Sequence, residues 1–296
     1  MTARLANPTI LVLLCLLCVP TLAGAEVAYV DTATGVRIGE SELADRLRDT
    51  DAVLIGELHG NVQHHRVQAR IIQMLVDAGR EPALYFEMLS ERQEKRYEVF
   101  RDTLKQSPAL LLPLEQHGRL REEALEWTSR GWPQWNAYAP LFELADRADL
   151  AVLHADLPGP LMRDIVLYGP MAIPRSLREQ LFPPARADEL GALSQRLSPL
   201  MGHAHQLEEG SPAIGGLVIA QLARDAYMAL RLSRGRGQRV LVAGREHVRT
   251  DVGVPQHLKG FDPKLRVLAI GPIQASSDNF RYAPYDIVWG SMDSSP

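Results

Sequence analysis

Cysteine is scarce in this chain and absent from most of it. Of the 296 residues only two are cysteine, and both, Cys15 and Cys18, lie in an apolar run near the N-terminus. If that run is removed, the mature chain has no disulfide, no thiolate metal ligand and no cysteine nucleophile. An ordinary apolar core must then hold the chain together, and its length suits one large domain or one domain with an insertion.

Excess positive charge and several well-known site motifs are also missing. The net charge is −4 and no basic block stands out, so we expect no nucleic-acid partner. The chain has no Gly-x-Gly-x-x-Gly loop for a dinucleotide and no Gly-x-Ser-x-Gly elbow of an α/β-hydrolase. It has no His-Glu-x-x-His zinc motif and no Cys-x-x-Cys-His motif for covalent haem attachment. These absences disfavour a dinucleotide-binding site, an α/β-hydrolase, a zinc site of the His-Glu-x-x-His type and covalently attached haem.

The N-terminus has the layout of a secretory signal peptide. Arg4 precedes an apolar run over 9–19, and small residues end the segment at Ala25. The run is shorter than the roughly 20 residues that cross a bilayer. Leucines rather than small residues precede both cysteines, which disfavours a lipid anchor. We therefore expect a signal peptide at 1–25 and an exported product, periplasmic or associated with the outer membrane; an uncleaved anchor is the alternative.

Short apolar runs alternate with helical patterns along the rest of the chain. Strands are expected at 52–55, 83–86, 150–153, 239–243 and 265–270, and helices at 63–78 and 214–232. This alternation predicts an α/β fold, a mainly parallel sheet flanked by helices, as one domain over 26–290. Charged, proline-broken helical segments at about 91–135 and 170–210 are expected to form a smaller helical subdomain, or to be long crossover helices.

Acidic and imidazole side chains follow four of the expected strands. Two of these strand ends share the pattern Gly-x-x-His, from Gly56 to His59 and from Gly244 to His247. Ligands bind at the carboxyl ends of strands in such sheets, and unpaired buried charge is costly. The imidazole and carboxylate set suits iron, zinc or manganese. The residues at these ends are Glu57, His59, Glu87, His154, Asp156, Glu246 and His247.

Residues beside these turns extend the candidate site. His64 opens the helix after the first turn and can overlook the same pocket. Arg245 and Arg249 can pair with ligand carboxylates, or simply with neighbouring acidic residues. The aromatic cluster at 132–140 is either core packing or a wall for a flat ligand. The remaining histidines are expected to be structural or surface residues: His117, His203, His205 and His257.

Taken in order, these motifs resemble the ChaN-type haem-binding uptake family. The resemblance rests on Ile55-Gly-Glu-Leu-His59, on Phe86-Glu87, on Trp135-x-x-Tyr138-x-Pro140, on the stretch 221–229, and on Val242-Ala-Gly-Arg-Glu-His247. It covers roughly 31–260. The family is part of a superfamily with Tiki and TraB proteins, which is marked by two Gly-x-x-His motifs and further acidic residues.

The resemblance implies haem as the cofactor and haem or iron uptake as the function. It also implies a membrane haem-uptake system as a partner and a possible homodimer, since some members bind haem between two subunits. His64, Tyr138, Arg245 and Arg249 are then the candidate haem contacts. The family's iron-ligating tyrosine has no certain counterpart here, and candidates from their surroundings are Tyr29, Tyr138 and Tyr227.

The Tiki branch implies a different function, a metal-dependent hydrolase of protease type. His59, His247 and Glu57 would then hold a divalent metal such as zinc or manganese. Glu57 and Glu87 would be the catalytic carboxylates, with Glu87 as the general base. A third hypothesis is that the chain is an interaction module, in which the site is inherited from an ancestor but is no longer used. The sequence leaves open whether the chain is an enzyme.

Overall fold

The structure is a computed structural model that describes residues 27–106, 114–273 and 283–291. The expected signal peptide at 1–25 and the last residues of the chain lie outside this part. The strands are β1 (Val27–Asp31), β2 (Arg37–Ile38), β3 (Ala52–Glu57), β4 (Ala83–Phe86), β5 (Val152–His154), β6 (Arg239–Gly244), β7 (Val267–Pro272) and β8 (Ile287–Ser291).

One sheet of eight strands runs through the described part of the chain, in the order β2-β1-β8-β7-β3-β6-β4-β5. The strands from β8 to β5 pair in parallel, whereas β1 pairs antiparallel with β2 and with β8. This confirms the predicted α/β fold with a mainly parallel sheet. Because β3, β6, β4 and β5 run side by side in one direction, their carboxyl ends meet at one edge.

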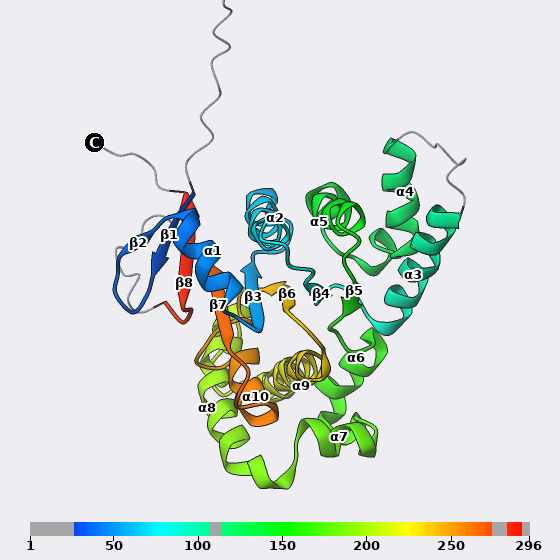
Figure 1. Ribbon diagram of the computed structural model, residues 1–296. Helices are drawn as coiled ribbons and strands as arrows, with labels where there is room; N and C mark the ends of the chain where they lie inside the picture. Colours follow the sequence, from blue (N-terminus) through cyan, green and yellow to red (C-terminus); the bar gives the residue numbers. More distant parts are fainter. Residues whose placement is uncertain (1–26, 107–113, 274–282, 292–296) are drawn as a thin grey trace, which may run out of the picture.

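Helices cover both faces of the sheet, and the central strands are apolar on both sides as a result. In β3, Val53 and Ile55 belong to one core cluster and Leu54 to another, because successive side chains point to opposite faces. Figure 1 shows α2 (Val62–Asp77) and α5 (Trp135–Arg147) on one face, and α9 (Pro212–Arg234) and α10 (Val254–Phe261) on the other. The helix α1 (Glu40–Arg48) contributes Leu43 and Leu47 to the first cluster.

The two segments expected to be helical pack in different places. The first holds α3 (Glu91–Gln106), α4 (Leu114–Ala124) and the 3-10 turn η1 (Thr128–Arg130). Leu125 and Trp127 of this segment join the core cluster beneath α2 and α5. The second follows α6 (Gly159–Tyr168) and holds η2 (Gly169–Ala172), α7 (Arg175–Leu181), η3 (Pro184–Arg186) and α8 (Ala187–Ala204), which pack against α9. The domain boundaries at 26–290 stay a prediction.

The helix α9 is long and apolar enough to cross a membrane by length and composition alone, with a mean hydropathy of 1.2 over its best window. Its apolar side chains are shared among three core clusters, and Ala223, Met228 and Leu232 are each 0% exposed. Packing against the sheet and against α6–α8 therefore accounts for its apolar composition.

A buried histidine on α10 makes stability depend on pH. His257 is 0% exposed, and neither of its ring nitrogens has a hydrogen-bond partner among the described residues. Burial lowers the pKa of His257 to about 3 from its ordinary 6.5. The unfolded chain therefore binds a proton that the folded chain does not, and the free energy of unfolding falls as the pH drops below 6.5 toward 3.

We expect this histidine to remove about 2 kcal/mol of stability between about pH 7 and about pH 5. Urea unfolding of the wild type and of His257→Leu at both pH values measures the effect. The variant should show a pH-dependent loss smaller by about that amount. Equal pH dependence in the two proteins would contradict the assignment.

Candidate functional site

Two glycines let the two Gly-x-x-His loops meet. β3 and β6 are parallel neighbours, and Glu57 pairs in register with Gly244. A Cβ atom at Gly56 would lie 2.7 Å from Val248 Cγ2, and one at Gly244 would lie 3.0 Å from His59 Nε2. Both glycines are inside the strands, and neither has a positive φ. Their role is to let the two loops approach each other closely.

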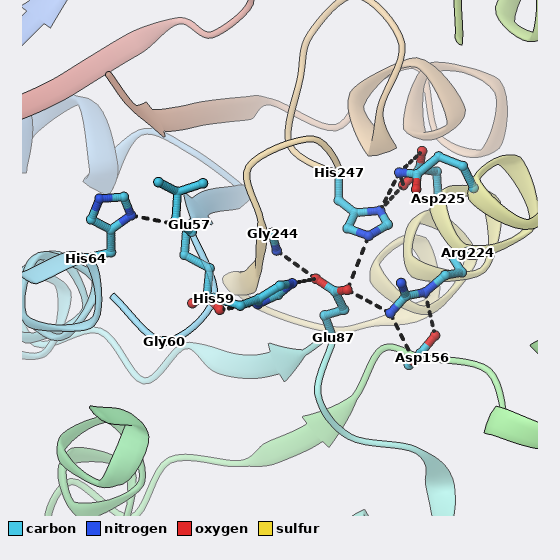
Figure 2. Close-up of polar contacts among 12 residues, drawn as sticks. Glu57, His59, Gly60, His64, Glu87, Asp156, Arg224, Asp225, Gly244 and His247 are labelled. Carbon is cyan, nitrogen blue, oxygen red and sulfur yellow. Dashed lines mark hydrogen bonds and ion pairs between the residues drawn. The ribbon is translucent and has the colours of Figure 1, made fainter. Parts of the chain in front are cut away.

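Glu87, directly after β4, is the centre of the polar cluster at the strand ends (Figure 2). Its Oε1 accepts a hydrogen bond from Arg224 at 2.7 Å and lies 3.2 Å from His247 Nε2. Its Oε2 accepts one from the backbone N–H of Gly244 at 2.6 Å and lies 3.7 Å from His59 Nε2. The two motif histidines therefore face the two oxygens of one carboxylate.

Charge within the cluster is strongly compensated around Glu87. Burial alone would raise the pKa of Glu87, but the positive charges of His247 and Arg224 outweigh it and hold that pKa well below 4.5. Arg224 also binds Asp156, with Nε 3.0 Å from Oδ1. Burial raises the pKa of Asp156, although the charge of Arg224 acts to lower it. A 21%-exposed arginine side chain thus joins two nearly buried carboxylates.

His247 lies between two carboxylates from different elements. Its Nδ1 is 2.5 Å from Oδ1 of Asp225, a fully buried residue of α9, while Nε2 faces Glu87. Burial would lower the pKa of His247, but Glu87 and Asp225 raise it to about 10. At neutral pH the imidazole is therefore protonated and donates on both sides.

Glu57 is the second anchor, on the other side of His59. His59 Nδ1 lies 2.7 Å from its Oε1, and the Tyr138 hydroxyl donates to the same oxygen at 2.7 Å. His65 Nδ1 lies 3.1 Å from Oε2, but its hydrogen bond is with Gln68 Oε1 at 3.0 Å, which leaves Oε2 without a hydrogen-bond partner among the described residues. Burial would raise the pKa of Glu57, but its contacts with the two histidines lower it to about 2.

The metal and catalytic assignments of the cluster stay predictions. Among the described residues, no group of three or more histidine, aspartate and glutamate side chains is placed to hold a metal ion. Both ring nitrogens of His247 face carboxylates, Nε2 facing Glu87 and Nδ1 facing Asp225.

The predicted haem contacts near this cluster are largely occupied. Tyr138 is 0% exposed, and its hydroxyl is used by Glu57. The Nδ1 of His64 accepts a hydrogen bond from the Leu58 N–H at 2.9 Å, and its ring packs on Trp289 at 4.7 Å between centroids. Burial lowers the pKa of His64 to about 4. Both assignments stay predictions.

The two arginines of the second motif pair locally, which is the simpler of the two expectations. Arg245 Nε lies 3.0 Å from Glu246, and Arg249 Nη2 lies 2.8 Å from Asp251. Both are partly exposed, so their guanidinium groups can be reached from solvent.

The other candidate tyrosines are also engaged or buried. Tyr29 in β1 is 3% exposed. Tyr227 on α9 is half-buried, and its hydroxyl lies 2.9 Å from Nε2 of His154. The other ring nitrogen of His154 contacts Glu94 at 2.7 Å, so this histidine belongs to a separate group and not to the cluster around Glu87.

Sequence reasoning missed three members of the cluster: Arg224, Asp225 and His65. The signal for the first two was present, because a charged pair interrupts the apolar pattern of 214–232. A fully buried aspartate requires a cation, and the chain supplies His247 from a loop 22 residues further on. His65 follows His64 directly in the sequence, and only the structure shows that His65 is the one with 0% exposure.

A second candidate surface lies away from the strand ends. Three large apolar or aromatic side chains at the end of α6 and in η2 are about 70% exposed: Leu167 at 70%, Tyr168 at 70% and Met171 at 72%. Val166 adds a further 37%-exposed side chain. We name these four residues the α6–η2 patch. Grouped exposed apolar side chains mark binding surfaces more often than chance exposure does.

The chain belongs to the haem-binding uptake family of the Tiki superfamily, ChaN, whose family model matches residues 43–258. This match includes both Gly-x-x-His turns, Glu87 and the charged pair on α9. It confirms the resemblance inferred from the motifs. No curated protein matches the chain.

Solved structures share the fold. The structure described as "Cofacial heme binding to ChaN of Campylobacter jejuni" superposes with a TM-score of 0.70 at 20% identity, covering 89% of this chain and 96% of that one. A weaker likeness is a mutant of the erythromycin esterase EreC in its open conformation, with a TM-score of 0.42 at 15% identity over 86% of this chain and 78% of that one. The type III effector HopBA1 gives 0.42 at 17% over 83% and 89%. At this identity the first match supports the fold, and the others carry no argument.

Proposed function

We propose that this chain is an exported haem-binding protein of haem or iron uptake, and that the haem lies against the α6–η2 patch. The observation that carries the proposal is Tyr168, an exposed tyrosine among exposed apolar side chains. Its hydroxyl makes no hydrogen bond within the described part of the chain. Family membership supports haem as the ligand, and the closed cluster around Glu87 leaves the patch as the better surface.

The surroundings of the patch match the chemistry of haem, a flat apolar ring with two carboxylates. Pro170 of η2 lines a pocket of about 610 Å³ whose wall also includes Phe182 and Ile219. Arg175 and Arg178 of α7 line the same pocket, where Arg175 pairs with Glu179 at 2.7 Å across an exposed contact that a haem carboxylate would replace. Apolar pockets with a few placed polar groups are typical of small-molecule sites, and arginine forks bind carboxylates.

The chain's own residues would have distinct tasks there. Tyr168 would provide a phenolate oxygen, and Leu167 and Met171 would exclude water from the ring face. Arg175 and Arg178 would meet the carboxylates. Haem, when bound, would supply the iron that the Tyr168 oxygen holds.

The exposure of the patch also supports a homodimer. Side chains that are 70% exposed cannot cover both faces of a flat ligand from one subunit. A second copy of the chain would bury the outer face. A membrane haem-uptake system is the proposed recipient, and the periplasm or the outer membrane is the proposed location.

The test is a titration of the purified mature chain with haemin, followed in the Soret band. We expect saturation near one haem per subunit and a shift to a dimer in size-exclusion chromatography. Leu167→Glu with Met171→Glu should weaken binding by roughly 100-fold, because two apolar contacts are replaced by buried charge.

Val99→Glu is the matched control, because Val99 is 66% exposed on α3 and lies outside the patch. It should leave haemin affinity unchanged. No saturable Soret change in the wild type would refute haem binding. Equal weakening by patch and control variants would refute the location.

A further inference from the structure

A separate basic cleft opens at the carboxyl ends of β4 and β5. It has a volume of about 1010 Å³. One wall is the start of α3 with the preceding loop, the second is η1 with Ser129 and Arg130, and the third is the first half of α6 with Gly159 and Arg163. The sheet edge that holds it is the one where open α/β sheets bind ligands. A cleft of this size admits a small organic molecule.

Two arginines in this cleft lack a carboxylate partner among the described residues. Arg130 Nη1 donates only to the backbone carbonyl of Met88. Arg163 makes no ion pair or hydrogen bond within the described chain. The two guanidinium groups come from different walls, η1 and α6.

The other three cations that line the cleft have partners. Arg92 forms a two-pronged contact with Glu126, at 2.6 and 2.9 Å. Lys95 pairs with Glu91 at 2.5 Å, and Arg96 donates to the Ala124 carbonyl at 2.8 Å. Arg130 and Arg163, by contrast, form no ion pair among the described residues.

Two further features favour an anion at this place. Arg130 is half-buried, and desolvation destabilises its charged form and lowers its pKa. A bound anion would stabilise that charged form. The helix α6 begins at the cleft with Gly159, and no side chain caps its N-terminus. The positive end of the helix dipole and its free N–H groups attract negative charge.

We propose that this cleft binds a small organic anion with at least two carboxylate or phosphate groups, one held by Arg130 and one by Arg163. Arginine forks recognise both groups through paired hydrogen bonds. The cleft and the α6–η2 patch share no residue, because the cleft is lined by α6 only as far as Arg163, whereas the patch begins one helical turn later at Val166.

The experiment is calorimetric titration of the haem-free chain with citrate and, separately, with pyrophosphate. We expect saturable binding of at least one probe below about 1 mM. The tighter probe identifies the carboxylate or the phosphate source. Arg130→Ala and Arg163→Ala should each weaken it by roughly tenfold. Arg163 is exposed, so its variant tests the site even if Arg130→Ala folds poorly.

Arg236→Ala is the matched control, since this exposed arginine precedes β6 at the other end of the sheet. It should bind the probe as the wild type does. Absence of binding by both probes, or equal weakening in the control, would overturn the proposal. Competition between haemin and the probe would overturn the claim of a separate site, whereas haemin affinity unchanged by Arg130→Ala supports it. If the chain binds a probe but not haemin, the haem proposal fails and the proposed anion site still stands.

Discussion

Replacing Glu87 with alanine is expected to lower the free energy of unfolding by about 3–5 kcal/mol. Glu87 is 1% exposed and compensates Arg224 and His247 at once. Removing it leaves two partly or fully buried cations with fewer partners and the Gly244 N–H without an acceptor. Urea denaturation at neutral pH, followed by far-ultraviolet circular dichroism, measures the loss.

The control for this prediction is Glu246→Ala, because Glu246 is the sequence neighbour of His247 but lies at the surface. Glu246 is 37% exposed and pairs with Arg245 and Arg249. Exposed pairs contribute about 0–1 kcal/mol, so this variant should be nearly as stable as the wild type. If Glu87→Ala lost no more than the control, the cluster would not be the internally compensated group described here.

Replacing Trp127 with alanine is expected to cost about 3–5 kcal/mol through the cavity it leaves. Its ring is 1% exposed and packs on Tyr138 at 4.6 Å and on Trp135 at 5.4 Å between centroids. Its Nε1 donates to the Pro133 carbonyl at 2.7 Å, which fixes the loop before α5. The loss should therefore also loosen Tyr138, which holds Glu57.

Thermal unfolding of Trp127→Ala beside Trp132→Ala measures this effect. Trp132 is only half-buried, at the edge of the same aromatic group, where it contacts His59 at 5.3 Å. We expect the second variant to lose clearly less stability, because less of its ring is removed from water. Equal losses would show that Trp127 is not the centre of the aromatic packing.

The central strands and the paired motif could be predicted because their signals are local. A buried parallel strand is a continuous apolar run, and the runs at 52–55, 83–86 and 239–243 fall inside β3, β4 and β6. The carboxyl ends of such strands meet for reasons of topology alone. Glu57, Glu87 and His247 could therefore be placed together before any coordinates were known.

The antiparallel edge could not be predicted, since its signals are weak and far apart. β1 and β2 are short, and β8 pairs with β1 across more than 250 residues of chain, as in the register of Val27 with Ser291. The sequence also could not show that Asp225 and Arg224 complete the cluster, because a helix packed on the far face brings them to it. For that reason the sequence could not show that Glu87 and His247 are paired with α9.

Tyr168 was missed for the opposite reason. It lies between the strand expected at 150–153 and the helical segment expected at about 170–210, and only the structure shows that it and Leu167 and Met171 are exposed together. Exposure of a side chain depends on which face of α6 packs on α9. Here Ile165 takes the buried position and leaves its neighbours outside.

The most direct test of the haem proposal compares two tyrosine variants that lose the same hydroxyl group. Tyr168→Phe and Tyr138→Phe are each saturated with haemin, and resonance Raman spectra are recorded for the iron–phenolate vibrations. The account predicts that these bands are present in the wild type, persist in Tyr138→Phe and vanish in Tyr168→Phe. Bands that vanish in Tyr138→Phe and persist in Tyr168→Phe would contradict it and place the haem at the strand ends.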